Sequence, residues 1–246
     1  MPAPFIPELS NLPIGENALK VIKIGGHLLM NEEGSFRINY IHDLLNVLKR
    51  ISRETGHKIV VVVGGGYTAR KYIGAARKSN VNESILDTLG IMVSRLNASL
   101  LYSIYYNKAP IIPKSLEELA YLLSTNLDVI FMGGLQPGQS TTTVAALVAE
   151  STNSDLIITT NVDGIYTTDP KKDPKAKLLK RVNVSLLKKI FDKEELAGEY
   201  RMLDPLSIKI ISRSKISTHI INGENPQNIL DLVIEGKDIG TLIVFE

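Results

Sequence analysis

The chain contains no cysteine and no tryptophan in its 246 residues. Without cysteine it can form no disulfide, offer no thiolate nucleophile and build no cysteine-ligated zinc site. It also lacks any run of about 18 apolar residues, the length that spans a bilayer. Residues 1–20 carry no apolar core of the signal-peptide type. We therefore expect a cytoplasmic protein that has no membrane partner.

The chain also lacks a large excess of charge of either sign. The formal net charge is +2, which is too small to indicate a nucleic-acid partner. The length suits one α/β domain with two lobes. Prolines at positions 2, 4, 7 and 13 indicate an extended N-terminal segment over residues 1–19. A single domain is then expected over residues 20–246.

Short apolar runs of strand length, by contrast, are plentiful. Six of them are expected to be buried strands, because helix-length segments with 3.6-residue periodicity separate them. Such alternation predicts an α/β fold with a mainly parallel sheet. The runs cover residues 20–24, 59–63, 128–132, 155–159, 217–221 and 241–245.

Two of the separating segments have clear helical periodicity. The segment from Asn39 to Arg53 places its apolar residues on one face, which should cover the sheet. The longer segment from Glu83 to Tyr106 is expected to pack centrally or against another subunit. Its apolar residues at helical spacing are Ile85, Leu89, Met92, Leu96 and Leu100. Residues 166–183 are polar and are interpreted as a surface loop, with a mobile flap as the alternative.

Three of the apolar runs end in glycines. A triple glycine occupies residues 64–66, and glycine pairs stand at 25–26 and 133–134. Only glycine lets a phosphate approach the backbone closely at a strand end, where the N–H groups of a following helix also point outward. The repetition predicts a shared phosphate-binding cleft.

Two common nucleotide motifs are disfavoured. Gly64, Gly66 and Ala69 satisfy G-x-G-x-x-A, but the acidic residue expected about 20 positions later should end a second strand. Glu83 and Asp87 instead open a helix-periodic segment. A Walker P-loop is missing too, because no glycine is followed by Lys-Ser or Lys-Thr.

Charged and hydroxyl side chains flank the glycines. Lys23 could reach over the first pair to a phosphate oxygen, or it could be an edge-strand lysine that extends to solvent. Arg70 would begin the helix after the triple glycine, where its planar fork suits phosphate, although a solvated face is the alternative. Ser140 or Thr141 can cap the next helix and also direct N–H groups at an anion. Spacing alone makes Asp87 an ordinary solvated carboxylate.

The histidines show no pairing with an acid or a nucleophile, and no metal-ligating set emerges. A kinase that acts on an alcohol commonly needs a base to accept the hydroxyl proton. A phosphate acceptor needs none, because its second pKa is near about 6 and the attacking oxygen is already mostly anionic.

Six motifs in a fixed order resemble the archaeal type of UMP kinases, which are members of the amino acid kinase family. The ordered set is more specific than any single motif. The motifs are KIGG at 23–26, GGGYTARKYI at 64–73, LDTLGIMVSRLNA at 86–98, GGLQPGQSTTTVAALVAE at 133–150, TNVDGIYTTDP at 160–170 and the segment 202–216.

The resemblance implies a three-layer αβα subunit in a homohexamer. It implies transfer of the γ-phosphoryl group of ATP to UMP, giving UDP, with Mg²⁺ as cofactor and without a general base. The acceptor-binding lobe would cover about residues 20–150 and the ATP-binding lobe about residues 151–246.

Carried over by position, Lys23 and Arg70 would be the catalytic residues, and no residue is assigned to a metal. The resemblance assigns ATP to Lys23, Gly25, Gly26, Gly66, Arg70, Thr160, Asn161, Tyr166 and Asp169. It assigns UMP to Gly65, Asp87, Leu135, Gln136, Pro137, Gly138, Gln139, Ser140 and Thr141. Asp87 would accept hydrogen bonds from the ribose hydroxyls.

Three features depart from the family pattern: Thr142 stands where many relatives carry aspartate, His27 follows the first glycine pair, and residues 1–19 precede the domain. A leader of this kind is similar to that of molybdenum or tungsten storage proteins with the same fold. A non-catalytic oxyanion-storage or nucleotide-sensing homologue is therefore the alternative function. A sister kinase for another small phosphate, such as isopentenyl phosphate, is a third.

Overall fold

The computed structural model describes residues 19–170, 172–191 and 202–245. The predicted N-terminal extension lies outside these ranges, apart from Leu19, which begins the first strand. Within them, none of the helices combines the length and the apolar character that crossing a membrane requires.

A seven-stranded sheet forms the centre of the fold, in the order β3-β2-β1-β4-β6-β7-β5. Every neighbouring pair is parallel except β6 and β7. The strands are β1 (Leu19–Ile24), β2 (Lys58–Val63), β3 (Val129–Met132), β4 (Asp155–Thr160), β5 (Arg181–Asn183), β6 (Thr218–Asn222) and β7 (Thr241–Val244). The six predicted strands are confirmed, as is the mainly parallel sheet.

The prediction for residues 166–183 was wrong at its end, because β5 occupies the last three residues and pairs with β7. An isolated bridge between Tyr166 and Leu178 also ties the segment to itself. The other described residues of the segment form loops and turns, as predicted.

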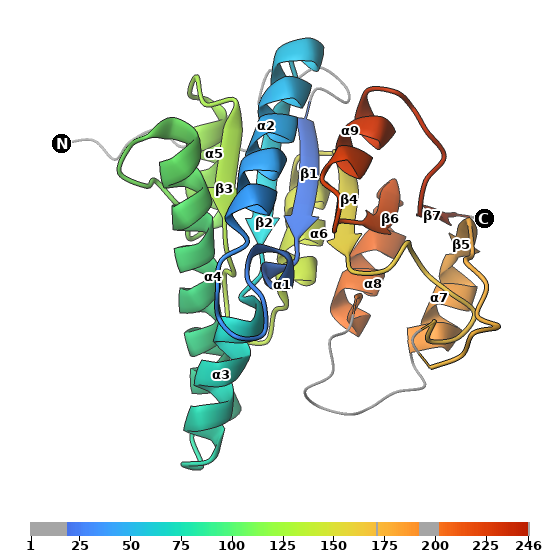
Figure 1. Cartoon of the computed structure of the whole chain (residues 1–246), viewed down its shortest axis with the longest axis horizontal. Helices are drawn as coiled ribbons and strands as arrows, with labels where there is room; N and C mark the ends of the chain where they lie inside the picture. The colour runs from blue at the N-terminus through green and yellow to red at the C-terminus, as the bar shows by residue number, and fades with distance from the viewer. Residues whose placement is uncertain (1–18, 171, 192–201, 246) are drawn as a thin grey trace.

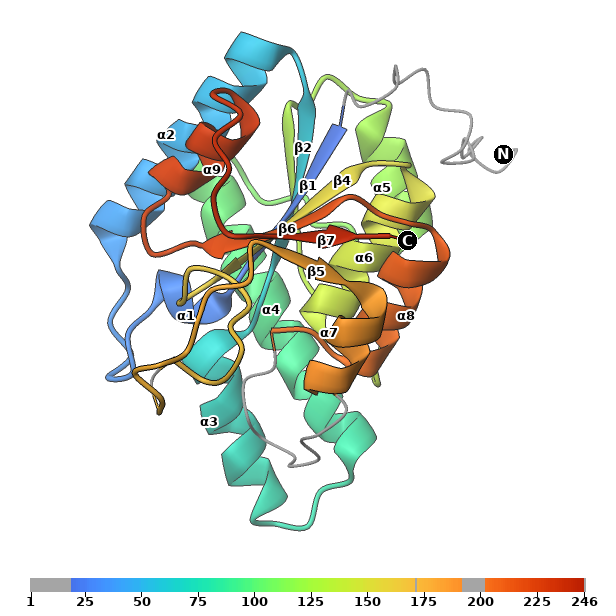
Figure 2. The same cartoon turned by 90° about the vertical axis from the view of Figure 1, so that its right-hand side faces the viewer.

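Helices cover both faces of the sheet, which confirms the three-layer αβα architecture (Figures 1 and 2). One face carries α1 (Gly26–Leu29), α2 (Ile38–Thr55), α4 (Glu83–Tyr106) and α9 (Gln227–Val233). The other carries α5 (Leu116–Leu123), α6 (Thr141–Ser151), α7 (Val184–Phe191) and α8 (Pro205–Arg213). Helix α3 (Gly66–Arg77) packs against α4 below the sheet in Figure 1.

Helix α4 has the predicted bounds and packs against the sheet, as predicted, but three of the five apolar residues predicted to carry that packing face outward. Ile85, Met92 and Leu96 are exposed, whereas Leu86, Ala98 and others on a different side of the helix are buried. Both sides are apolar, so periodicity located the helix without showing which side the core covers. The alternative, a contact with another subunit, stays a prediction.

Candidate active site

The three glycine-rich loops meet at one edge of the sheet, because β1, β2 and β3 are parallel neighbours and their carboxyl ends coincide. The chain runs outward from β1 through β2 to β3 and then returns to place β4 on the other side of β1. In open α/β sheets, ligands bind at such a reversal of strand order. The fold therefore puts the predicted phosphate loops where a ligand is expected.

The first two glycine loops touch through their backbones. A Cβ atom added to Gly26 would lie 2.3 Å from the Gly64 carbonyl oxygen and 2.5 Å from the Gly66 nitrogen. The Gly64 N–H donates to the Ile24 carbonyl at 2.9 Å. Gly66 begins α3 with φ of +62°, a left-handed conformation that favours glycine. Glycine is required here so that two strand ends can approach each other.

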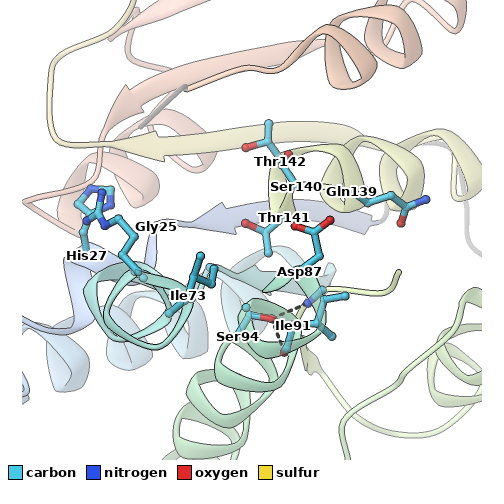
Figure 3. A pocket seen from close by; sticks show the side chains of 18 of the residues that line it. Gly25, His27, Ile73, Asp87, Ile91, Ser94, Gln139, Ser140, Thr141 and Thr142 are labelled. Atoms are coloured by element: carbon cyan, nitrogen blue, oxygen red, sulfur yellow. Dashed lines mark hydrogen bonds between the residues drawn. The ribbon is translucent and has the colours of Figure 1, made fainter. Parts of the chain in front are cut away.

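A cleft of about 360 Å³ opens where these loops meet α4 and the start of α6 (Figure 3). Such a volume suits a small-molecule ligand. Ten of the predicted site residues line it: Lys23, Gly25, Gly26, Gly65, Gly66, Arg70, Asp87, Gln139, Ser140 and Thr141. The structure thus brings together residues from four separate motifs.

The charged residues of the cleft come from β1, α3 and α4. Lys23 is only 3% exposed and is the second-last residue of β1, just before the glycine pair. Arg70 is exposed, and its guanidinium lies 4.5 Å from the centre of the Tyr67 ring. The Asp87 carboxylate accepts a hydrogen bond from the Gly138 N–H at 2.7 Å. Two cations and one hydrogen-bonded carboxylate therefore surround the space.

Arg95 of α4 holds the loop before α6 by hydrogen bonds to its backbone. Its guanidinium donates to the carbonyls of Gly134 at 2.9 Å and Leu135 at 3.1 Å. Four predicted site residues of this loop do not line the cleft: Leu135, Gln136, Pro137 and Gly138. Gly138 reaches it only through Asp87.

Ser140 is the residue that caps α6. Its hydroxyl oxygen accepts the Thr143 N–H at 3.0 Å, and its backbone is extended. The predicted cap is confirmed, and of the two candidates the structure selects Ser140 over Thr141. The first N–H groups of α6, on Thr141 and Thr142, have no acceptor within the helix, and both residues line the cleft.

The four residues predicted to surround adenosine lie outside the cleft, at the end of β4 and in the loop after it: Thr160, Asn161, Tyr166 and Asp169. The Thr160 hydroxyl is buried without a hydrogen-bond partner among the described residues. The Tyr166 hydroxyl donates to Asp163 at 2.9 Å. Burial, and then this hydrogen bond, raises the pKa of Tyr166. These residues share the sheet edge with the cleft.

Besides Arg95, two further supporting residues of α4 were not predicted. The Ser94 hydroxyl donates to the Ile91 carbonyl and accepts the Gly134 N–H at 2.8 Å. The Asn97 amide donates to the Gly64 carbonyl at 2.9 Å. Gly90, Ser94 and Asn97 are spaced at i, i+4 and i+7, which is a small and polar stripe in an apolar helix. That stripe was the available signal that α4 faces backbone loops.

The two atypical residues, His27 and Thr142, both line the cleft and are both buried. The His27 ring packs over Gly25, where an added Cβ would lie 2.4 Å from ring atom Cε1. Figure 3 shows Gly25 and His27 at one end of the cleft and the Gln139–Thr142 segment toward the other. The Thr142 hydroxyl donates to the Met202 carbonyl at 3.3 Å.

The fold and the cleft agree with what is found among known proteins. The family model described as the amino acid kinase family matches residues 18–222, and the chain belongs to this family. Uridylate kinase from Thermofilum pendens is 50% identical over 230 residues, covering 94% of this chain and 99% of the relative. Uridylate kinase from Sulfurisphaera tokodaii is 47% identical, covering 91% and 97%. The resemblance seen in the motifs is confirmed.

Solved structures agree as well. Uridylate kinase from Archaeoglobus fulgidus superposes with a TM-score of 0.80 at 36% identity, covering 92% of this chain and 99% of that one. UMP kinase from Bacillus anthracis superposes with a TM-score of 0.77 at 20% identity, covering 92% and 95%. At that identity the second likeness concerns the fold alone.

Proposed function

We propose that this protein is a UMP kinase, which transfers the γ-phosphoryl group of ATP to UMP and forms UDP. The observation that carries the proposal is the backbone contact between the Gly25–Gly26 and Gly64–Gly66 loops inside a cleft lined by Lys23 and Arg70. Two anion-binding loops in contact suit a reaction that joins two phosphate chains. The names of the curated relatives support UMP as the acceptor.

Chemistry in this cleft is proposed to proceed by positioning and charge stabilisation. Among the described residues that line the cleft, Asp87 carries the one carboxylate and His27 the one imidazole. Asp87 already accepts a backbone N–H. A phosphate acceptor needs no base, because its oxygen is anionic at neutral pH. Lys23, Arg70 and the loop N–H groups can offset the charge repulsion between the substrates.

The two substrates are proposed to enter from the two halves of the chain. UMP would bind the acceptor lobe, residues 20–150, with its phosphate at Gly65 and the start of α6 and its ribose at Asp87. ATP would bind residues 151–246, with its phosphates on the Gly25–Gly26 pair. The buried Thr160 hydroxyl supports this, because a polar group left without a partner at a strand end suits a ligand contact.

Magnesium is proposed to arrive as part of the Mg-ATP substrate. Across the described ranges, no cluster of three or more histidine, cysteine, aspartate or glutamate side chains could hold a metal ion. Mg²⁺ commonly keeps its waters and binds through substrate phosphates with only one or two carboxylates. The chain's own residues fit that arrangement, since they supply cations and N–H groups for the phosphate oxygens.

The proposal is tested by measuring ADP release from Mg-ATP with UMP, CMP, isopentenyl phosphate or no acceptor. We expect UMP to raise the rate well above the no-acceptor background. Background rates with every acceptor, together with bound molybdate or tungstate in a metal analysis, would favour the storage homologue. A response to isopentenyl phosphate alone would favour the sister kinase.

Self-association through α4 is proposed as well, in the homohexamer that the resemblance implies. Met92 is 61% exposed and Leu96 is 68% exposed, and both lie on the outward stripe of α4 with Ile85. Tyr72 of α3 adds a further exposed apolar side chain. Clustered exposed apolar residues of this kind mark interaction surfaces.

Replacing Met92 and Leu96 with lysine together is expected to reduce the assembly size, because two desolvated charges would face each other across the contact. Light scattering coupled to size-exclusion chromatography measures the mass directly. Leu186→Lys is the matched control, since Leu186 is also an exposed apolar residue but lies on α7. An unchanged mass in the double variant would exclude this face as the contact.

A further inference from the structure

One carboxylate, that of Asp204, joins the starts of α6 and α8. Its Oδ1 accepts the N–H groups of Leu206 at 3.1 Å and Ser207 at 3.0 Å, which caps α8. The same Oδ1 accepts the Thr143 hydroxyl at 2.8 Å, and Oδ2 accepts the Ser140 hydroxyl at 2.5 Å. Capping α8 is thus only half of what this side chain does.

The contact determines what Ser140 can offer a ligand. A serine hydroxyl has one proton and two lone pairs. In Ser140 the proton is donated to Asp204, and a lone pair accepts the Thr143 N–H. Ser140 therefore has no proton to donate to a phosphate. The groups left for an anion at this helix start are the Thr141 hydroxyl and the first free N–H groups of α6.

The contact also spans the two halves of the chain. Ser140 and Thr143 stand at the start of α6, in the acceptor half, whereas Asp204 stands directly before α8, in the ATP half. Thr143 is fully buried and its hydroxyl holds Oδ1, whereas Ser140 is exposed and its hydroxyl is bound to Oδ2. The negative charge of Asp204 is balanced by four donors and by the N-terminal ends of two helices. It can therefore stand beside an anion-binding cleft without repelling the ligand.

We infer that Asp204 is a positioning residue for the acceptor loop. It holds Ser140 so that the start of α6 keeps its N–H groups and the Thr141 hydroxyl directed at the phosphate of the acceptor. This inference rests on the proposed function for the identity of that acceptor. It assigns Ser140 a role in loop geometry and removes it from the direct phosphate contacts that its motif suggests.

The test separates the two roles of Asp204, which are to cap α8 and to bridge to α6 by accepting the Ser140 hydroxyl. Serine is as good a helix cap as aspartate, but its side chain is too short to reach Ser140, so Asp204→Ser keeps one role and loses the other. Ser207→Ala does the reverse, because it removes the reciprocal half of the same cap and leaves the Asp204 carboxylate with Ser140. Ser140→Ala removes the Ser140–Asp204 contact from the other side, at an exposed position, and removes the cap of α6 with it.

We expect Asp204→Ser and Ser140→Ala each to raise the KM for UMP by about 10-fold, as loss of a charge-assisted hydrogen bond would. The KM for ATP should not change, and the double variant should be no worse than either single one. Ser207→Ala should lower the melting temperature without changing either KM. A rise in both KM values together, or a rise in Ser207→Ala, would overturn the inference.

Hydrogen exchange provides a readout that needs no catalysis. The Thr143 amide should exchange faster in Asp204→Ser, because its acceptor Ser140 is released. A wild-type protein without phosphoryl transfer to UMP would refute the proposed function alone. Unchanged exchange at Thr143 in Asp204→Ser would refute the role of Asp204, whatever the reaction is.

Discussion

Replacing Lys23 with methionine is expected to lower kcat for UMP phosphorylation by at least about 10³-fold, within the range for a charge that stabilises a transferring phosphoryl group. Lys23 is paired in register with Val62 of β2 and Ile158 of β4, in the middle of the sheet. Its neighbours Ile22 and Ile24 are fully buried. Lys23 stands near the carboxyl end of this strand and lines the cleft, where its charge can face a transferring phosphoryl group.

The measurement is steady-state kcat at saturating Mg-ATP and UMP. Methionine keeps much of the side-chain volume, so a loss of rate reports the loss of charge and not a cavity. Lys20→Met is the matched control, because Lys20 lies on the same strand but forms a salt bridge with Asp155 at the opposite end of the sheet. It should reduce stability and spare kcat. A Lys23→Met enzyme as fast as Lys20→Met would place Lys23 outside the chemistry.

Most strands could be predicted from the sequence because both faces of a parallel sheet are buried. Helices lie on both faces, so the strands read as continuous apolar runs, and β1 to β4 were located from such runs. β5 was missed because its three residues, Arg181, Val182 and Asn183, include only one buried apolar side chain. Strand order was beyond reach, because runs of valine and isoleucine do not encode which neighbour each strand takes.

The cleft was predictable to the extent that backbone requirements leave a trace in the sequence. Glycine pairs after strands mark loops that must approach closely, and the structure brings the predicted loops together. Side chains that act by reaching a backbone carbonyl leave little trace. Arg95 holds one loop from α4 in this way, and Asp204 holds Ser140 by accepting its hydroxyl, yet each could equally be an ordinary surface or capping residue in the sequence.

Gly66→Ala is expected to destabilise the fold by about 3 kcal/mol, from a left-handed backbone that costs a non-glycine residue about 1–2 kcal/mol and from overpacking that costs a similar amount. The added Cβ would lie 2.4 Å from the Gly26 carbonyl carbon and 2.7 Å from its carbonyl oxygen. Both contacts are backbone, so no side chain can rotate away to relieve them. The loops must separate instead, and the distance between the donor and acceptor phosphates would grow with them.

Urea unfolding measures the stability change, and kcat/KM for UMP measures the change at the cleft, where a shift of about 1 Å can cost about 100-fold. Gly74→Ala is the control, because Gly74 lies on the same helix α3 with nothing within 4 Å of an added Cβ. That variant should be as active as wild type and more stable by about 0.5–1 kcal/mol, the usual gain in a helix interior. Both variants add one methyl group to α3, so a difference between them reports the close backbone contact at Gly66. If Gly66→Ala matched Gly74→Ala in stability and activity, the two phosphate loops could not be in contact, and the cleft would lose the feature on which the proposed transfer depends.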